Sequence, residues 1–237
     1  MNVYDLIITD KKQMDWDNVL MDVQNRESIN QLLKEYKYAE QLISFDLPIN
    51  NKILLHGSSG CGKTTTAKAI AKALGKNLYI LDLSNIISSR IGETSQNLKK
   101  VFDKVKYENA VLFLDEFDQI GKMRGKDDKD VGEMRRLVNT LIQLIDYFPE
   151  KSVLIAATNQ LEIIDKAVIR RFQCIIEYRM PNKKELDKYY DLLLLRFPDN
   201  LRKVQRKYKI SYAEAKDYTY TIIKSIVIKE IENNYKL

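Results

Sequence analysis

The sequence contains few of the residues that stabilise small secreted scaffolds. It has two cysteines, four prolines and eight glycines among its 237 residues. Two cysteines cannot build a disulfide framework, nor a zinc site by themselves, and such a content is typical of proteins in a reducing cytoplasm. The low proline and glycine contents exclude collagen-like and linker-dominated chains. We therefore expect a folded, cytoplasmic protein.

Long apolar runs are also absent from the sequence. No stretch approaches the roughly 18 consecutive apolar residues that a membrane-spanning helix requires. The first residues lack the cationic segment followed by an apolar run that marks a signal peptide. Apolar residues nevertheless make up 45% of the chain and charged residues 30%, which is sufficient for a sizeable core. We expect a protein that neither enters a membrane nor is exported.

The net charge of +6 is not spread evenly along the chain. Residues 1–178 contain 25 basic and 25 acidic side chains, whereas residues 179–237 contain 14 basic and 8 acidic ones. A basic excess indicates either a polyanion-binding surface or a solvated lysine-rich face. Five of these basic residues are concentrated in one short run, namely Arg202, Lys203, Arg206, Lys207 and Lys209. We interpret the excess first as a contact with another subunit or partner, and second as a nucleic-acid surface.

The hydrophobic pattern predicts two kinds of architecture along the chain. Apolar strand-like runs alternate with helical segments over residues 51–180, which is typical of a parallel sheet flanked by helices. After Pro181 only helical spacing remains. We therefore predict an α/β domain with five parallel strands over residues 51–180 and a small all-helical domain over 181–237. Residues 1–50 are predicted to form a lead-in segment and one helix.

A glycine-rich motif follows the first predicted strand. Its residues fit the pattern G-x-x-x-x-G-K-[ST]: Gly57, Ser58, Ser59, Gly60, Cys61, Gly62, Lys63 and Thr64. Such a loop surrounds phosphate groups with backbone N–H donors, and the helix that follows adds its dipole to the anion site. Lys63 is expected to reach the β- and γ-phosphates, and Thr64 to place its hydroxyl on Mg²⁺, with Thr65 beside it. The motif predicts a nucleotide site.

Two carboxylates follow the apolar run at residues 111–114. We expect Asp115 to hold Mg²⁺ through water and Glu116 to polarise the attacking water as a general base. This pair is what a nucleotide hydrolase requires beyond phosphate binding. The next strand ends at Asn159, whose amide is suited to bind the γ-phosphate or the water.

Two adjacent arginines, Arg170 and Arg171, lie further along the chain. A guanidinium group makes bidentate contacts to developing phosphate charge. Because both residues are far from the phosphate loop in sequence, we expect them to serve a neighbouring subunit's nucleotide.

These motifs, in this order, resemble the AAA ATPases, the ring-forming remodelling branch of the AAA+ superfamily. The resemblance rests on the phosphate loop, LFLDEFD at 112–118, ATN at 157–159 and IIDKAVIRRF at 163–172. It implies a P-loop NTPase sheet followed by a helical lid, with ATP and Mg²⁺ bound between the subunits of a ring, usually a hexamer. It also implies that Asn159 is the first sensor and that Arg170 and Arg171 are trans-acting fingers. The family usually separates the two arginines by Pro-Gly, so which of them reaches the phosphate stays open.

Three weaker parts of the resemblance concern segments around the nucleotide and the ring pore. Asp15–Val19 resembles the lead-in whose backbone lines the adenine pocket, and Ala213 stands where this branch has a small residue in the lid. Arg90, Ile91 and Gly92 resemble the first pore loop, with an arginine in place of the usual aromatic residue. A guanidinium favours acidic segments or chain termini, so we expect substrate-selective remodelling more than processive threading.

Three functions agree with these features. The first is Mg²⁺-dependent ATP hydrolysis that remodels or disassembles a protein substrate in a homo-oligomeric ring. The second is a nucleotide-gated DNA-transaction ATPase similar to helicase loaders, favoured by the basic C-terminal region. The third is a regulatory ATPase for a separately encoded protease or defence effector. The sequence resembles one minimal ATPase module, so we expect substrates to be found through a partner or adaptor.

Overall fold

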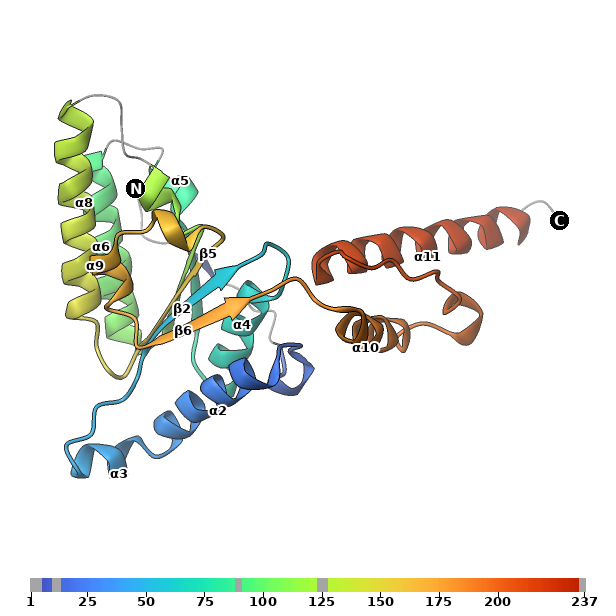
Figure 1. Cartoon of the computed structure of the whole chain (residues 1–237), viewed down its shortest axis with the longest axis horizontal. Coiled ribbons are helices and arrows are strands. Elements are labelled where there is room, and N and C mark those ends of the chain that lie inside the picture. Colours follow the sequence, from blue (N-terminus) through green and yellow to red (C-terminus); the bar gives the residue numbers. More distant parts are fainter. Residues whose placement is uncertain (1–5, 10–13, 88–90, 123–127, 235–237) are drawn as a thin grey trace. The chain divides into compact units, whose positions relative to one another are not determined.

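The structure is a computed structural model that describes residues 6–9, 14–87, 91–122 and 128–234 (Figure 1). The chain divides into two compact units. The first comprises Met1–Gly57 and Lys63–Glu177, and the second comprises Ser58–Gly62 and Tyr178–Leu237. The predicted pore-loop residue Arg90 lies outside the described residues, whereas Ile91 and Gly92 form the start of a helix.

The first unit is built on a mostly parallel sheet with the strand order β1-β3-β4-β5-β2-β6. The strands are β1 (Ile8–Thr9), β2 (Lys52–Gly57), β3 (Leu78–Asp82), β4 (Val111–Asp115), β5 (Val153–Thr158) and β6 (Cys174–Tyr178). Neighbours β3, β4, β5 and β2 pair in parallel. The prediction of five strands omitted β1, a two-residue strand that pairs antiparallel with the edge of β3. Two residues are too few to produce a recognisable alternation.

Helices connect the strands and cover both faces of the sheet (Figure 1). They are η1 (Trp16–Asn18), α2 (Val23–Lys37), α3 (Ala39–Ser44), α4 (Lys63–Ala73), α5 (Leu83–Ile87), α6 (Ile91–Glu108), α7 (Gln119–Lys122), α8 (Asp128–Asp146), η2 (Leu161–Ile163) and α9 (Lys166–Ile169). The single helix expected within residues 1–50 is two helices, α2 and α3, interrupted at Tyr38.

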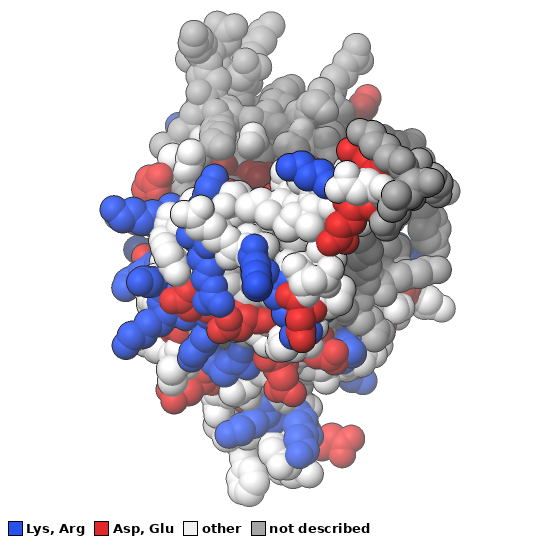
Figure 2. Space-filling model, turned by 90° about the vertical axis from the view of Figure 1, so that its right-hand side faces the viewer, with Lys and Arg blue, Asp and Glu red and all other residues white. Residues whose placement is uncertain are grey.

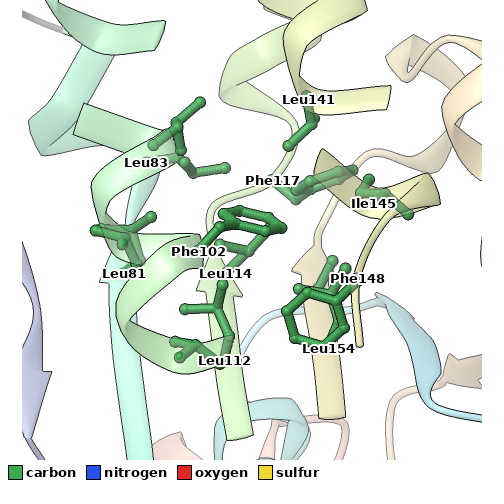
Figure 3. Close-up of a cluster of buried hydrophobic side chains, with 14 of the residues drawn as sticks. Leu81, Leu83, Phe102, Leu112, Leu114, Phe117, Leu141, Ile145, Phe148 and Leu154 are labelled. Atoms are coloured by element: carbon green, nitrogen blue, oxygen red, sulfur yellow. The ribbon is translucent and has the colours of Figure 1, made fainter. Parts of the chain in front are cut away.

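The core follows the alternation of side chains along the strands. Side chains from β3, β4 and β5 pack against α6 and α8 on one face, where Leu112, Phe117 and Leu141 are fully buried (Figure 3). In Figure 1, α4 and α2 cover the opposite face. Because β4 and β5 are buried on both sides, they read as continuous apolar runs in the sequence. This packing fixes the carboxyl ends of the strands, where the functional side chains lie.

Helix α4 has well-defined ends. It begins at Lys63, directly after Gly62, so its first N–H groups lie at the end of the phosphate loop. Its C-terminus is closed by Gly75, which has a φ of 63°. Lys76 N donates to Ala71 O at 2.9 Å and Gly75 N to Lys72 O at 3.0 Å, the pattern of a Schellman cap. The Ala-rich sequence between these ends is a strong helix former.

The C-terminal part of the second unit contains α10 (Lys183–Leu194), η3 (Asp199–Leu201) and α11 (Tyr212–Asn234). Asn182 and Glu185 form a capping box at the start of α10. Leu186, Tyr190 and Ala215 form part of a core of their own. This arrangement fits a helical C-terminal part, as predicted. Among the described residues, no helix has the length and apolar character needed to cross a membrane.

Candidate functional site

Parallel pairing brings the predicted acidic and polar side chains to one edge of the first unit's sheet. Asp115 is the last residue of β4, and it lies in register with Asp82 at the end of β3. Thr158 is the last residue of β5, the neighbour of β4 on its other side. Parallel strands end at the same edge, so their following residues converge. Asp82 was missed by the sequence analysis, although its position at the end of a predicted strand was a usable signal.

Lys63 is the central cation of this edge. Its side chain is buried, with 8% of the residue exposed. The Lys63 Nζ donates to Gly57 O at 2.8 Å and to Asn159 Oδ1 at 2.8 Å. The structure therefore brings together Lys63 and the predicted sensor Asn159, which are 96 residues apart in sequence. The Asn159 amide, expected to bind phosphate or water, here contacts the lysine.

Thr64 and Asp115 form the expected oxygen-donor pair. The Thr64 hydroxyl is hydrogen-bonded to the Asp115 carboxylate, and Asp115 also accepts from Glu116 N at 3.0 Å. Burial raises the pKa of Asp115, and the nearby Asp82 charge raises it further. The Glu116 N–H, Lys63 and Thr64 act in the opposite direction. A cation beside this carboxylate would favour its ionised form.

Thr64 and Asp115 supply oxygen ligands of the kind that Mg²⁺ binds. Mg²⁺ is held by one or two protein oxygen ligands together with waters and phosphates, and Thr64 and Asp115 supply such oxygens. Among the described residues, no group of three His, Cys, Asp or Glu side chains could hold a metal by protein ligands alone. A cage of protein ligands such as zinc requires is therefore not present in that part of the chain.

Glu116 adopts an unusual backbone conformation. Its φ is 50°, in the left-handed region that non-glycine residues rarely occupy and that costs about 1–3 kcal/mol. Three hydrogen bonds hold the turn around it: Asp115 Oδ1 accepts from Glu116 N, Ala157 O accepts from Phe117 N at 2.8 Å, and Glu116 O accepts from Gln119 N at 2.9 Å. Strain of this kind persists only where the surroundings enforce it. The backbone that carries this side chain is thus held in one conformation.

Most of the phosphate loop, Ser58–Gly62, belongs to the second unit. Ser58 N donates to Tyr178 O at 2.9 Å, and Ala213 N donates to Gly60 O at 3.1 Å. Gly60 has a φ of 71°, and a Cβ at this position would lie 2.6 Å from Ser211 Oγ. Glycine is therefore required at Gly60 by both conformation and space. The predicted loop and the predicted lid residue Ala213 are in direct contact within this unit.

The other loop residues are arranged around these contacts. Cys61 is 2% exposed, and its Sγ lies 3.8 Å from Met180 Sδ. Gly57 and Gly62, which flank the segment, have φ values of 120° and 110°. Ser59 is exposed. Positive φ angles at the glycines let successive N–H groups point to one side, as an anion site requires.

The lead-in segment is fixed by α2. Val19 is 2% exposed, and its carbonyl oxygen accepts a hydrogen bond from the Arg26 guanidinium. The same guanidinium stacks 5.1 Å from the centre of the Trp16 ring, while Trp16 Nε1 donates to Asn30 Oδ1 at 2.8 Å. The backbone expected to line an adenine pocket is therefore held in place by side chains of α2.

The two predicted fingers differ in their surroundings. Arg171 Nε lies 3.2 Å from Asp146 Oδ1, at the end of α8, and its Nη1 donates to Ala167 O at 2.6 Å. Arg170 ends α9 and is exposed. Its side chain has no hydrogen bond or ion pair to any residue that the structure describes. The sequence did not distinguish the two residues, because only folding brings Asp146 to one of them.

A separate cavity of about 490 Å³ lies beside Phe117. Its walls come from α7, α8, η2 and α9 and are mostly apolar, and Arg135 and Asp165 contribute charged groups. Neither Lys63 nor Asp115 lines it, so this cavity is distinct from the nucleotide site.

Comparison with known proteins agrees with this geometry. Residues 53–180 match the model of the AAA family, "ATPase family associated with various cellular activities". An "Uncharacterized AAA family ATPase y4kL" of Sinorhizobium fredii is 32% identical over 90% of this chain and 65% of its own length. A "Putative 26S proteasome regulatory subunit homolog" of Methanothermobacter thermautotrophicus is 33% identical over 72% of this chain and 48% of its own. A "Putative cell division cycle ATPase" of Plasmodium falciparum is 34% identical over 72% of this chain and 14% of its own.

The chain thus spans less than two thirds of the length of each of these relatives. The family model covers more than half of the chain and includes strands β3 to β6 and nearly all of β2, together with the phosphate loop, both carboxylates and both arginines. The resemblance inferred from the motifs is confirmed. The chain belongs to the AAA family of ATPases.

Proposed function

We propose that this chain is the ATPase module of a homo-oligomeric ring that couples Mg²⁺-dependent ATP hydrolysis to remodelling of a protein substrate. The observation that carries the hydrolytic part is the convergence of Lys63, Thr64, Asp115, Glu116 and Asn159 at one edge of the sheet. The ring is supported by Arg170, an exposed cation at the end of α9. A hexamer is the size that the family resemblance implies.

Each side chain of the site has a separate task. The Lys63 ammonium neutralises phosphate charge, and Asn159 holds that ammonium through the 2.8 Å hydrogen bond. Thr64 and Asp115 hold magnesium, which supplies neutralisation of negative charge on the phosphate oxygens. Glu116 accepts a proton from the attacking water. The constrained turn at Glu116 fixes the backbone from which the carboxylate extends, so little backbone reorganisation is needed during the reaction.

We further propose that Arg170 is the finger and Arg171 its support. Arg171 is engaged by Asp146 and by Ala167 O, so the side chain anchors α9 to the end of α8. Arg170 lies exposed at the C-terminal end of that anchored helix. A finger must leave its own subunit to reach the neighbour's phosphate, and Arg170 has no interaction to break within the described residues.

The lid's basic run supports a partner contact more than a nucleic-acid track. Arg202 is paired with Asp199, and Arg206 with Asp187 and Asp191. The hydrogen bonds from Arg206 and Tyr208 lower the pKa of Asp187, which keeps this acidic partner ionised. Figure 2 presents basic and acidic side chains interspersed over one face. A surface that follows a phosphate backbone would need unpaired cations in a row.

A DNA-transaction ATPase is the second candidate, favoured by the three lysines of the run, Lys203, Lys207 and Lys209, which are exposed. A regulatory ATPase for a separate protease is a variant of the first proposal. One relative is named a proteasome regulatory subunit homologue, which supports looking for such a partner.

The two candidates predict different stimulators of ATP turnover. With an unfolded acidic protein, we expect the turnover rate to rise several-fold, and with duplex or single-stranded DNA we expect no change at physiological salt. Replacing Lys203 and Lys207 with glutamine tests the lid charge, and Lys229→Gln on α11 is the matched control. DNA stimulation that falls steeply with salt and is lost in the double variant would overturn the proposal in favour of the second candidate.

A further inference from the structure

The turn that carries Glu116 and the turn that carries Asn159 are joined by one buried carboxylate, Asp118. It lies three residues after Asp115 and has no exposed surface. Asp118 Oδ1 accepts from Thr158 Oγ1 at 3.0 Å and from Asn159 N at 3.4 Å. The carboxylate thus reaches from the end of β4 to the residues that end β5.

Because Asp118 is buried, the hydrogen bonds that it accepts are costly to lose. A buried carboxylate is costly unless hydrogen-bond donors surround it, and breaking such an arrangement costs more than replacing it by apolar groups. Thr158 is also buried, with 1% exposed, and its hydroxyl accepts from Gln160 N at 3.0 Å while donating to Asp118. The single hydroxyl proton is therefore committed to Asp118, which sets the orientation of the hydroxyl. The turn from Thr158 to Gln160 is held by this pair of contacts.

Both ends of the link lead to side chains of the nucleotide site. On one side, the Asn159 amide oxygen accepts from Lys63 Nζ. On the other, Glu116 lies two residues before Asp118, in the left-handed conformation. The Phe117 N to Ala157 O hydrogen bond ties the same two segments by backbone alone. That bond fixes their separation, whereas the Asp118 contacts fix the direction in which Asn159 leaves the strand.

We propose that Asp118, through Thr158, is a positioning residue for hydrolysis: it sets Asn159 and Lys63 relative to Glu116. This inference rests on the roles proposed above for Glu116 and Asn159. Asp118 itself has no exposed surface and acts only through the residues it holds. Loss of the link is expected to misalign the water and the phosphate while the phosphate loop still binds nucleotide. Misplacements of about 1 Å can reduce turnover by about 100-fold.

The test uses Thr158→Val, which removes the hydroxyl but keeps the shape. We expect kcat for ATP to fall about tenfold or more, with the ATP KM changed less than twofold. Thr158→Ser retains the donor and should restore most of the rate. Thr221→Val is the matched control, because Thr221 is exposed and its hydroxyl bonds to Asp217 O within its own helix, α11. The melting temperature of each variant is measured alongside.

A second variant, Asp118→Asn, keeps an acceptor oxygen and removes the charge. We expect the double variant Asp118→Asn/Thr158→Val to lose no more kcat than the less active of the two single variants, because both substitutions weaken the same link. Multiplicative losses in the double variant would overturn the inference, as would an unchanged kcat in Thr158→Val. An equal loss in Thr158→Ser would also overturn it. Glu116→Gln in the same assay separates the two proposals: if that variant retains turnover, the proposed role of Glu116 fails instead.

Discussion

Glu116→Gln is expected to lower ATP turnover by about 100-fold or more while leaving ATP affinity unchanged. The glutamine keeps the size and the hydrogen-bonding reach of the side chain but cannot accept a proton, and general base catalysis contributes about 10²–10⁴-fold. The backbone contacts that hold the turn, from Phe117 and Gln119, do not involve the Glu116 side chain. Turnover is measured by phosphate release, and affinity with a fluorescent ATP analogue.

The matched control is Glu162→Gln, an exposed glutamate in η2 on the same unit. This substitution should leave both ATP turnover and ATP affinity unchanged. Wild-type turnover in the Glu116→Gln protein would show that another group accepts the proton. A parallel loss of ATP binding would instead assign Glu116 to nucleotide binding.

Arg170→Ala is expected to lower turnover by about a thousandfold without affecting nucleotide binding by isolated subunits. Fingers supplied from a neighbouring subunit contribute about 10³–10⁵ to the rate in related phosphoryl transfer. Arg171→Ala should have a smaller effect, accompanied by a lower melting temperature, because it removes the side chain that bridges Asp146 at the end of α8 and Ala167 O in α9. Arg196→Ala, in an exposed position of the second unit, is the control for loss of an arginine.

Mixing experiments test whether Arg170 acts in trans. In rings that contain Arg170→Ala and Glu116→Gln subunits together, some interfaces combine an intact Glu116 with an intact Arg170. We expect these mixtures to recover part of the turnover that neither variant has alone. If every mixing ratio gives only the sum of the separate activities, Arg170 does not complete a neighbour's site.

The parts of the fold that were predicted are those with long or highly specific signals. The buried strands β4 and β5 are uninterrupted apolar runs, and the helices α4 and α10 carry clear periodicity. The family resemblance and the mostly parallel α/β sheet with a helical C-terminal part are confirmed. Strand β1 was missed because two residues carry no pattern. The interruption at Tyr38 was missed because the apolar spacing of α2 continues into α3.

The candidate site was predicted where chemistry is local in sequence. The phosphate loop and Asp115 with Glu116 lie at strand ends, and strand ends converge in a parallel sheet. The contacts that connect these residues were not predictable. Lys63 with Asn159, and Asp118 with Thr158, are pairs 96 and 40 residues apart, and their geometry depends on how β5 aligns with β2 and with β4.

The arginine pairs illustrate the same limit at the surface. The run of basic residues after residue 200 indicated a field of positive charge, yet Arg202 and Arg206 are neutralised by acidic side chains near them in space. Likewise, Arg170 and Arg171 are equivalent in sequence, and only the position of Asp146 separates them. The assigned roles of the individual site residues, and of the pore-loop residues Arg90, Ile91 and Gly92, stay predictions.

The mass of the Glu116→Gln protein, measured in solution with Mg²⁺ and either ATP or ADP, tests the central claim most directly. A ring whose sites lie between subunits should be trapped by bound ATP that cannot be hydrolysed. With ATP we therefore expect a mass several times that of the 27.7 kDa subunit, near that of a hexamer, and with ADP a return toward smaller species. A single-subunit mass in both nucleotides, with ATP binding demonstrated in the same sample, would contradict the account.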